Sequence, residues 1–370
     1  MPHLIRSVRC RVLTARLHTP FVTALRRTDA LQSLLVEVTD DDGVTGVGEA
    51  AQVWPVTGES IASLRACIEG PLAEHVVGTD PGDLVETLRR MSSAVHGNST
   101  AKAAVDTALH DVAARRLGIP LVQLLGGTSL RVATDVTVSA SAADLLAATA
   151  AARVADGFTV LKLKVGTDPD GDVARVLAVR AAVGPAATLR LDANQGWTPR
   201  TAVRVISRLE DGGADVELVE QPVAAADLDG LRWVTDHVAT PILADESVFG
   251  VRDLIAVLQR RAADMVNVKL AKAGGLRPAR TLLELADAHG VGTLVGTMME
   301  GPVGVGAAAS LAAAHRTDAT DDLDAAWWLA SPPFPGGATY RGAEVHLPDR
   351  PGLGVELPAS LPQPLPAEPR

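Results

Sequence analysis

Residues 188–220 read TLRLDANQGWTPRTAVRVISRLEDGGADVELVE, and this stretch decides the fold. Its apolar pattern predicts a strand at Thr188–Asp192, a helix at Pro199–Asp211 and a second strand at Asp215–Glu220. Two strands joined by one helix pair in parallel through a right-handed crossover. Each strand ends in a carboxylate, so charged groups are expected together at one edge of a parallel sheet.

The same rhythm continues through the later part of the chain. Further helices are expected at Val251–Arg261 and Ala279–Ala288, and further strands at Thr159–Val165, Thr240–Asp245, Met265–Lys269 and Val291–Gly296. Successive strand ends carry Lys164, Asp192, Glu220, Asp245, Lys269, Thr297 and Asp324. An open sheet gathers ligands near one switch point, whereas in a β/α barrel all the carboxyl strand ends converge. This many contributing strands favour the closed barrel.

The first part of the chain has a different pattern. Three strand-like stretches are followed by a run of helices, which is typical of an α+β unit. The expected strands are Ile5–Leu17, Leu31–Thr39 and Thr45–Ala50, and the expected helices are Glu59–Cys67, Asp83–Ser93 and Thr100–Leu117.

The bulk composition argues against several classes of function. The 370 residues carry a formal net charge of −10, which disfavours a nucleic-acid surface or an anionic membrane as the main partner. No apolar run is long enough to span a bilayer. The two cysteines, Cys10 and Cys67, provide neither a zinc cluster nor a disulfide framework, so a cytoplasmic location is predicted.

Three carboxylates follow successive strands: Asp192 in LDANQ, Glu220 in VEQP and Asp245 in ADES. Together they supply the hard oxygen ligands that suit Mg²⁺, with open positions left for water and substrate. One acidic residue after a strand can instead cap the next helix, but caps poorly explain three in register. The pattern predicts a metal site.

Lysine is rare in this chain and strongly clustered. The 34 basic residues include lysine only at 102, 162, 164, 269 and 272. Lys162 and Lys164 share one face of a strand, and Lys269 follows four strands later, on the opposite wall of an eight-stranded ring. A neighbouring cation lowers the pKa of lysine and makes it a useful base. The alternative is that these lysines only neutralise the three carboxylates.

The motifs KLKVG, LDANQGW, VEQPV, ADESVF and NVKLAKAGGL, with PGLG near Gly352, resemble the muconate-lactonizing branch of the enolase superfamily over essentially the whole chain. The resemblance implies an α/β fold, a modified (β/α)7β TIM-like barrel with an N-terminal α+β capping domain. The implied boundaries are 1–128 for the cap, 129–325 for the barrel and 326–370 for a segment that returns to the cap and ends in a proline-rich tail.

The same resemblance implies roles for individual residues. One Mg²⁺ per subunit would be bound by Asp192, Glu220 and Asp245. Lys164 and Lys269 would form the acid/base pair, and Lys162 would stabilise an enediolate. Lys102 and Lys272 would be structural.

Further residues bear on the substrate. Asp322 and Asp324 share one face and resemble the Asp-x-Asp motif by which dipeptide epimerases bind a substrate ammonium, although solvated charges are the alternative. Arg26, in the loop 20–26, resembles the arginine that pairs with a glutamate side chain in L-Ala-D/L-Glu epimerases; a plain surface arginine is the alternative. Residues that match substrate-adjacent positions of the family are Thr137, Ser139, Thr297 and Met298, and departures from its pattern occur at Trp54-Pro55 and Met299-Glu300-Gly301-Pro302.

These observations predict an Mg²⁺-dependent dipeptide epimerase that inverts the C-terminal residue, with Ala-Glu as the favoured substrate. The resemblance implies that such an enzyme takes part in the recycling of cell-wall peptides. We also expect it to be a homo-oligomer. Two lysines on opposite faces permit 1,1-proton transfer, but the geometry also permits cycloisomerisation or dehydration with one of them. The alternatives are an epimerase of hydrophobic or mixed dipeptides, an N-acylamino acid racemase or cycloisomerase of the same branch, and a barrel retained as a binding protein.

Overall fold

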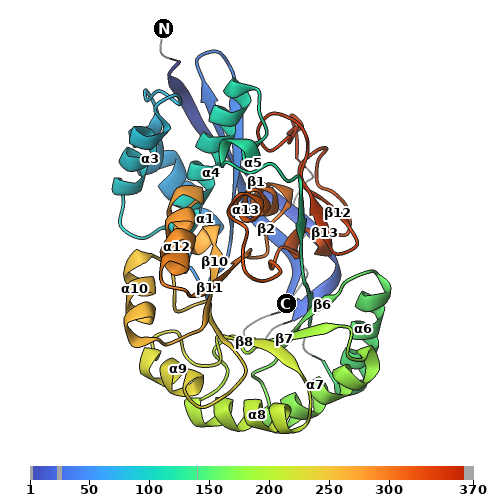
Figure 1. The fold of residues 1–370 in the computed structure, drawn as a ribbon. Helices are drawn as coiled ribbons and strands as arrows, with labels where there is room; N and C mark the ends of the chain where they lie inside the picture. Colours follow the sequence, from blue (N-terminus) through green and yellow to red (C-terminus); the bar gives the residue numbers. More distant parts are fainter. Residues whose placement is uncertain (1–2, 23–26, 140, 362–370) are drawn as a thin grey trace.

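The computed structural model describes residues 3–22, 27–139 and 141–361, and it divides visibly into a cap and a barrel (Figure 1). The cap begins with an antiparallel sheet in the order β1-β2-β3. Its strands are β1 (Ile5–Val22), β2 (Arg27–Asp40) and β3 (Thr45–Ala51). Its helices are α1 (Ile61–Cys67), the π-helical η1 (Ile68–Leu72), α2 (Ala73–Val76), α3 (Leu84–Ser93), α4 (Ser99–Leu117) and α5 (Leu121–Leu124).

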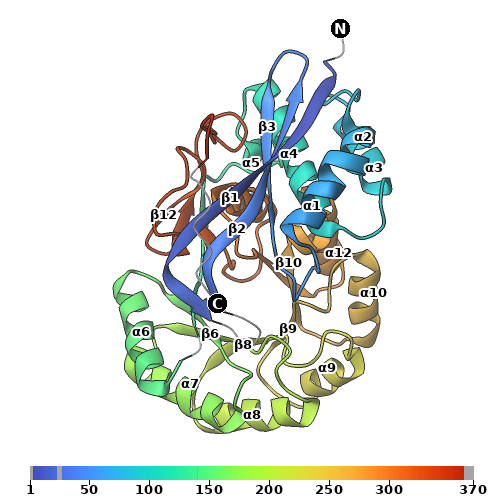
Figure 2. The ribbon, with the colours of Figure 1, turned by 180° about the vertical axis from the view of Figure 1, so that it is seen from behind.

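The first strand is longer than expected, because β1 continues past Leu17 to Val22. The pairing with β2 resumes at Phe21 after a register shift that follows Arg16. As a result the β1–β2 ribbon leaves the cap and extends over the barrel (Figure 2). Its tip contacts the barrel, where the Val22 N–H donates to Ser139 Oγ at 3.2 Å.

The barrel contains a seven-stranded parallel sheet in the order β11-β10-β9-β8-β7-β6-β5, with helices along its outer side (Figure 1). Its strands are β5 (Val136–Val138), β6 (Val160–Lys164), β7 (Thr188–Asp192), β8 (Val216–Glu220), β9 (Ile242–Ala244), β10 (Met265–Lys269) and β11 (Gly292–Gly296). Its helices are α6 (Ala143–Ala155), α7 (Pro169–Val183), α8 (Pro199–Asp211), α9 (Leu228–Thr235), α10 (Val251–Arg260), α11 (Leu270–Ala273), α12 (Leu276–Ala288) and α13 (Pro302–His315). The strand order confirms the predicted β/α repetition.

An expected eighth strand ending at Asp324 is not formed as a strand among the described residues. Instead, Asp321 and Asp322 make single parallel bridges to Thr134 and Gly296. These two bridges link the segment before β5 to β11 and so close the ring. The strand cannot continue because Asp324 is already in the helical region, at φ −79° and ψ −4°, where it begins the 3₁₀-helix η2 (Ala325–Trp328).

The C-terminal segment returns to the start of the barrel and to the cap. A small antiparallel sheet in the order β12-β13-β4 joins β12 (Thr339–Arg341) and β13 (Glu344–His346) to β4 (Arg131–Ala133). Beyond it, Gly352 donates to Ile119 O and accepts from the Leu121 N–H, both at 2.9 Å. In the described part of the chain, no helix combines the length and apolarity that a bilayer-spanning segment requires.

Candidate active site

The three predicted ligand carboxylates lie side by side at the carboxyl ends of adjacent strands. Asp192 ends β7 and pairs in register with Glu220, which ends β8. Asp245 lies one residue beyond β9. All three are almost completely buried. Uncompensated buried carboxylates are costly, so this cluster requires cations close by.

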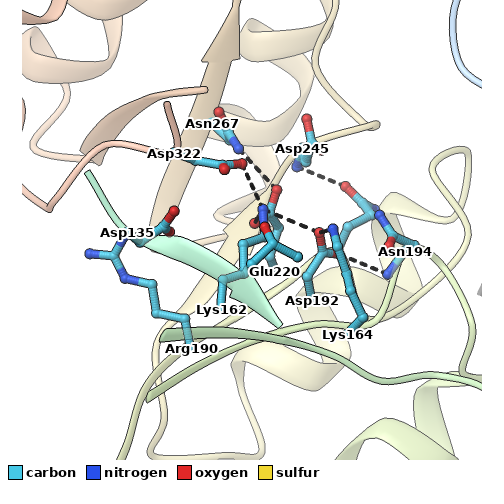
Figure 3. A network of polar contacts seen from close by, with 12 residues as sticks. Asp135, Lys162, Lys164, Arg190, Asp192, Asn194, Glu220, Asp245, Asn267 and Asp322 are labelled. Carbon is cyan, nitrogen blue, oxygen red and sulfur yellow. Dashed lines mark hydrogen bonds and ion pairs between the residues drawn. The ribbon is translucent and has the colours of Figure 1, made fainter. Parts of the chain in front are cut away.

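Lysines supply positive charge inside the same cluster, and Figure 3 shows Lys162 and Lys164 among the carboxylates. The Lys162 ammonium lies at its centre, 2.6 Å from Glu220, 2.8 Å from Asp322 and 3.2 Å from Asp192. Lys164 contacts Asp192 at 2.5 Å from the β6 side. The predicted same-face placement of Lys162 and Lys164 is therefore observed.

Lys269 reaches the cluster from the other side of the ring. It ends β10, four strands from β6 in the sheet order, and its ammonium lies 2.8 Å from Asp245. Lys164 and Lys269 both line a single pocket at the mouth of the barrel. The expected arrangement of two amines on opposite walls of one pocket is thus present.

The pKa directions set by the protein groups differ from the expectation of lowered lysine pKa values. Burial lowers the pKa of Lys162, but Asp322, Glu220 and Asp192 outweigh it and hold that pKa well above its ordinary value. The pKa of Lys269 is raised in the same way, because the effect of Asp245 and Glu220 outweighs the effect of burial. These ion pairs with the carboxylates correspond to the alternative that the sequence left open for the lysines.

The donor set at the strand ends fits a hard divalent cation. Three buried carboxylates from adjacent strands are the oxygen-rich set that Mg²⁺ takes. Two further buried oxygens nearby, Asn194 Oδ1 and Glu246 Oε2, have no hydrogen-bond partner among the described residues. Buried oxygens without donors are rare in proteins, and a cation or its water ligands would satisfy them.

The carboxylates do not yet converge on a single point. Among the described residues, only His3, Asp41 and Asp42 bring three ligand atoms within 4.8 Å of one another, on the surface of the cap. At the strand ends each carboxylate turns toward a lysine instead. Side-chain rotations would therefore accompany coordination of a metal there.

Several supporting residues were not predicted from the sequence. Asn267 donates to Glu220 Oε1 at 2.9 Å from the inner face of β10. Gln221 accepts from the Asp245 N–H at 2.9 Å and adopts φ +36°, so it ties the end of β8 to the end of β9. Lys272 lies 2.5 Å from Asp245 Oδ1, which brings a residue expected to be only structural into the cluster. The spacing from Asn267 to Lys269 repeats that of Lys162 and Lys164, and this signal could have identified Asn267.

The two aspartates of the closing segment have different partners. Asp322 pairs with Lys162. Asp324 Oδ2 accepts from the Thr137 N–H at 2.7 Å and from Trp328 Nε1 at 2.9 Å. Both aspartates line the pocket, and no lysine of the described residues pairs with Asp324.

The remaining predicted positions fall as follows. Thr137, Thr297 and Met298 line the pocket. Ser139 lies outside that lining and contacts the tip of β1. Arg26 lies outside the described residues. The apolar part of the pocket lining is formed by Phe21, Val53, Pro55 and Val56 of the cap and by Met298 and Met299 after β11.

Comparison with known proteins places this geometry in a family context. Residues 5–126 match the mandelate racemase/muconate lactonizing enzyme N-terminal domain, and residues 145–361 match the enolase C-terminal domain-like family. The chain is 43% identical to an L-Ala-D/L-Glu epimerase of Bacillus subtilis over 93% of its own length and 96% of that protein.

Two solved structures are closely similar. A substrate-liganded complex of the L-Ala-D/L-Glu epimerase from Bacillus subtilis superposes with a TM-score of 0.93, at 42% identity, over 97% of this chain and 99% of that one. A dipeptide epimerase from Enterococcus faecalis, complexed with Mg and L-Leu-L-Tyr, superposes with a TM-score of 0.92, at 36% identity, over 96% of this chain and 100% of that one.

Proposed function

The chain belongs to the mandelate racemase/muconate lactonizing group of the enolase superfamily, and we propose that it is a Mg²⁺-dependent dipeptide epimerase that inverts the C-terminal residue by two-base 1,1-proton transfer. It is an isomerase that acts on amino acid derivatives. The observation that carries the two-base proposal is the placement of Lys164 and Lys269 on opposite walls of one pocket.

The lysines divide the work of proton transfer. One of Lys164 and Lys269, as a neutral amine, takes the proton from the substrate α-carbon, and the other, as an ammonium, returns a proton to the opposite face. The net result is inversion, with one proton gained and one lost by the protein. Lys162, held among the carboxylates, is placed to stabilise the negative charge that develops on the substrate carboxylate as the enediolate forms.

Asp192, Glu220 and Asp245 would hold the Mg²⁺, one per subunit. When bound, the metal supplies Lewis-acid stabilisation of the substrate carboxylate. With a metal offsetting their charge, Asp192, Glu220 and Asp245 would hold the lysines less strongly. For Lys269 this would weaken the two carboxylate contacts that raise its pKa, whereas Lys162 would keep Asp322 as its partner.

The substrate ammonium is assigned to the closing segment. Asp324 is the better candidate for binding this ammonium. Its Oδ2 is fixed by two donors, and it lines the pocket without a lysine partner among the described residues. Asp322 serves mainly as the partner of Lys162. Buried carboxylates at this spacing favour a dipeptide with a free amino terminus over an N-acylated substrate.

Two preferences are proposed for the second residue of the dipeptide substrate, and a separate observation favours each. Resemblance at Arg26 favours an acidic residue, as in L-Ala-D/L-Glu. The apolar wall around Phe21, Val53 and Met298 favours a hydrophobic one. A library of dipeptides with a constant N-terminal alanine separates the two, because preference for glutamate should be lost in Arg26→Ala and preference for an apolar residue should not.

We propose the setting of the reaction from the resemblance to L-Ala-D/L-Glu epimerases. That resemblance implies recycling of cell-wall peptides, and we propose that it takes place in the cytoplasm and that the enzyme is a homo-oligomer. The units proposed for this chain remain a cap at 1–128, a barrel at 129–325 and a returning segment at 326–370.

The function is tested by incubating the dipeptide library with enzyme and Mg²⁺ in deuterated water. Epimerisation should add one mass unit at the C-terminal α-carbon and should stop with EDTA. Lys164→Ala and Lys269→Ala should each abolish inversion while leaving exchange of one stereoisomer, a different one in each variant. Absence of exchange on every dipeptide would contradict the proposal, and turnover of N-acylated amino acids alone would favour the racemase.

A further inference from the structure

Two buried carboxylates that the proposed chemistry does not use lie directly behind the wall of the pocket. Glu49 is on β3 of the cap, and Glu300 lies in the turn between β11 and α13 of the barrel. Both are less than a tenth exposed. Glu300 follows Thr297 and Met298, which line the pocket.

Glu49 bridges the two parts of the molecule. One carboxylate oxygen accepts from Ser33 Oγ on β2 at 2.7 Å and from the Gly301 N–H at 2.8 Å. The other accepts from the Gly304 N–H, in the first turn of α13, at 3.1 Å. A carboxylate on the amino end of a helix is stabilised by the free N–H groups and by the helix dipole. A cap residue therefore holds the start of a barrel helix.

Glu300 closes the turn from the barrel side. Its Oε1 accepts from the Met298 N–H at 3.2 Å. It acts on the pocket through this bond, since Met298 and not Glu300 lines the pocket.

The first turn of α13 is shaped to admit both carboxylates. A Cβ on Gly301 would lie 3.0 Å from Glu49 Oε1, and one on Gly304 would lie 2.3 Å from Glu300 Oε2. Neither glycine has a positive φ, so close approach and not backbone conformation is what requires glycine here. The two glycines bring the carboxylates onto the same helix end.

The charges around Glu300 are unbalanced. Burial and then Glu49 raise the pKa of Glu300 to about 8, against the opposing effects of the Met298 N–H and of Lys269 at the end of β10. Burial also raises the pKa of Glu49, but Ser33 and the N–H groups of Gly301 and Gly304 counteract the rise. One proton on Glu300 removes the repulsion between two buried carboxylates that no ammonium contacts among the described residues.

We propose that Glu49 and Glu300 are positioning residues: ionised Glu49 anchors the start of α13 to the cap, and Glu300, carrying a proton, holds the turn that presents Thr297 and Met298 to the substrate. The proposal rests on the proposed epimerase function for its kinetic part. When Glu300 ionises, its carboxylate and that of Glu49 repel each other. The turn should then position Thr297 and Met298 less firmly, and substrate should bind more weakly.

The test compares Glu300→Gln, Glu300→Ala and the wild type as Mg²⁺-loaded enzymes. At about pH 7 we expect KM to rise about tenfold in Glu300→Ala, while Glu300→Gln, which keeps an acceptor for Met298, stays within about threefold of wild type. Above about pH 8 the wild-type KM should rise relative to that of Glu300→Gln.

Melting gives a second readout that needs no turnover. A carboxylic acid whose pKa is raised on folding makes the protein less stable as the pH rises from the unfolded-state pKa to the folded-state pKa. Above the folded-state pKa, this contribution to the unfolding free energy no longer changes. The wild-type midpoint should therefore fall relative to that of Glu300→Gln between about pH 5 and about pH 8, and level off above it. The exposed Glu284→Gln is the matched control and should show no such trend.

The outcomes separate cleanly. Equal KM losses in Glu300→Gln and Glu300→Ala would overturn the proposal, as would a melting difference that does not change with pH. If no dipeptide exchanges its α-proton, the proposed function fails, and the melting comparison still decides whether Glu300 carries the buried proton.

Discussion

Asp322 and Asp324 are only two residues apart, yet they meet different partners. Their spacing, together with the resemblance to dipeptide epimerases, suggested that both bind a substrate ammonium. In the structure, the Asp322 carboxylate is 2.8 Å from Lys162, whereas Asp324 is held by a backbone N–H and an indole N–H. Substituting the two should therefore affect different steps.

We expect Asp324→Asn to raise KM for dipeptides by about ten- to a hundredfold with a small change in kcat, because a charge-assisted contact worth about 1.5–3 kcal/mol is lost from binding. Asp322→Asn should instead lower kcat, because Lys162 loses a partner that orients it. Steady-state kinetics on a dipeptide and its N-acetylated form measure both effects. If both variants change only KM, by similar amounts, the division of roles is wrong.

At this scale the sequence predicted the charged residues well and their neutral supports poorly. Lysines are conspicuous in a chain with so few, and the carboxylates follow strands, so both sets could be found by spacing. Gln221 and Asn267 act through single hydrogen bonds that depend on the exact positions of neighbouring strand ends. Such positions depend on tertiary packing, which the local pattern does not encode.

Among the elements, β3 and α4 show how a close approach positions the cap. Gly46 and Gly48 face α4, where a Cβ on Gly48 would lie 1.8 Å from Ala104 O. Neither needs a positive φ. The strand lies against the helix backbone, and Glu49, the residue after Gly48, accepts hydrogen bonds from Gly301 and Gly304 of the barrel.

Gly48→Ala should destabilise the fold by about 2–3 kcal/mol, because the added methyl meets backbone that cannot rotate away. Gly250→Ala is the matched control: nothing lies within 4 Å of its Cβ position, and we expect it to cost less than about 1 kcal/mol. Urea unfolding of both variants measures the difference. Equal midpoints would mean that β3 can move off α4 without cost.

Element boundaries were predicted closely where turn residues mark them and missed where packing decides. The strand at Met265–Lys269 and the helix at Pro199–Asp211 have the expected limits. The strand β1 runs on to Val22 because β2 continues to pair with it, and the eighth strand is replaced by bridges because η2 begins at Asp324. In both cases the end of the element depends on contacts with another segment, and the local apolar pattern does not show such contacts.

For the molecule as a whole, the barrel mouth concentrates buried negative charge that a divalent cation would offset. We expect Mg²⁺ to raise the melting midpoint, with a gain of about 2.7 kcal/mol in unfolding free energy when the free metal is about a hundred times its Kd. Asp192→Asn should reduce this gain, and the surface variant Asp287→Asn should not. Identical midpoints in EDTA and in Mg²⁺ would argue against a metal at the strand ends.

The whole-molecule organisation depends on one buried carboxylate where three distant segments meet. Asp111 on α4 accepts from the Val47 N–H on β3 at 2.8 Å, from Arg115 Nε at 2.8 Å and from the Leu353 N–H of the returning segment at 2.6 Å. Gly352 makes room for this contact, since a Cβ there would lie 1.9 Å from Asp111 Oδ1. The PGLG motif is thus explained by the docking of the C-terminal segment onto the cap.

Asp111→Ala should destabilise the protein by about 3–5 kcal/mol, because two backbone N–H groups and the Arg115 guanidinium lose their acceptor in a buried position. Asp111→Asn keeps an oxygen for one N–H and should cost less. Limited proteolysis shows where the structure opens. In Asp111→Ala, the first cleavages should fall on the C-terminal side of Pro348, because the returning segment loses its contact with Asp111 of the cap while the barrel strands stay paired. Cleavage that begins within the barrel instead would show that the segment is held mainly by its apolar contacts, such as Leu353 and Val355, and that Asp111 only secures α4 to β3.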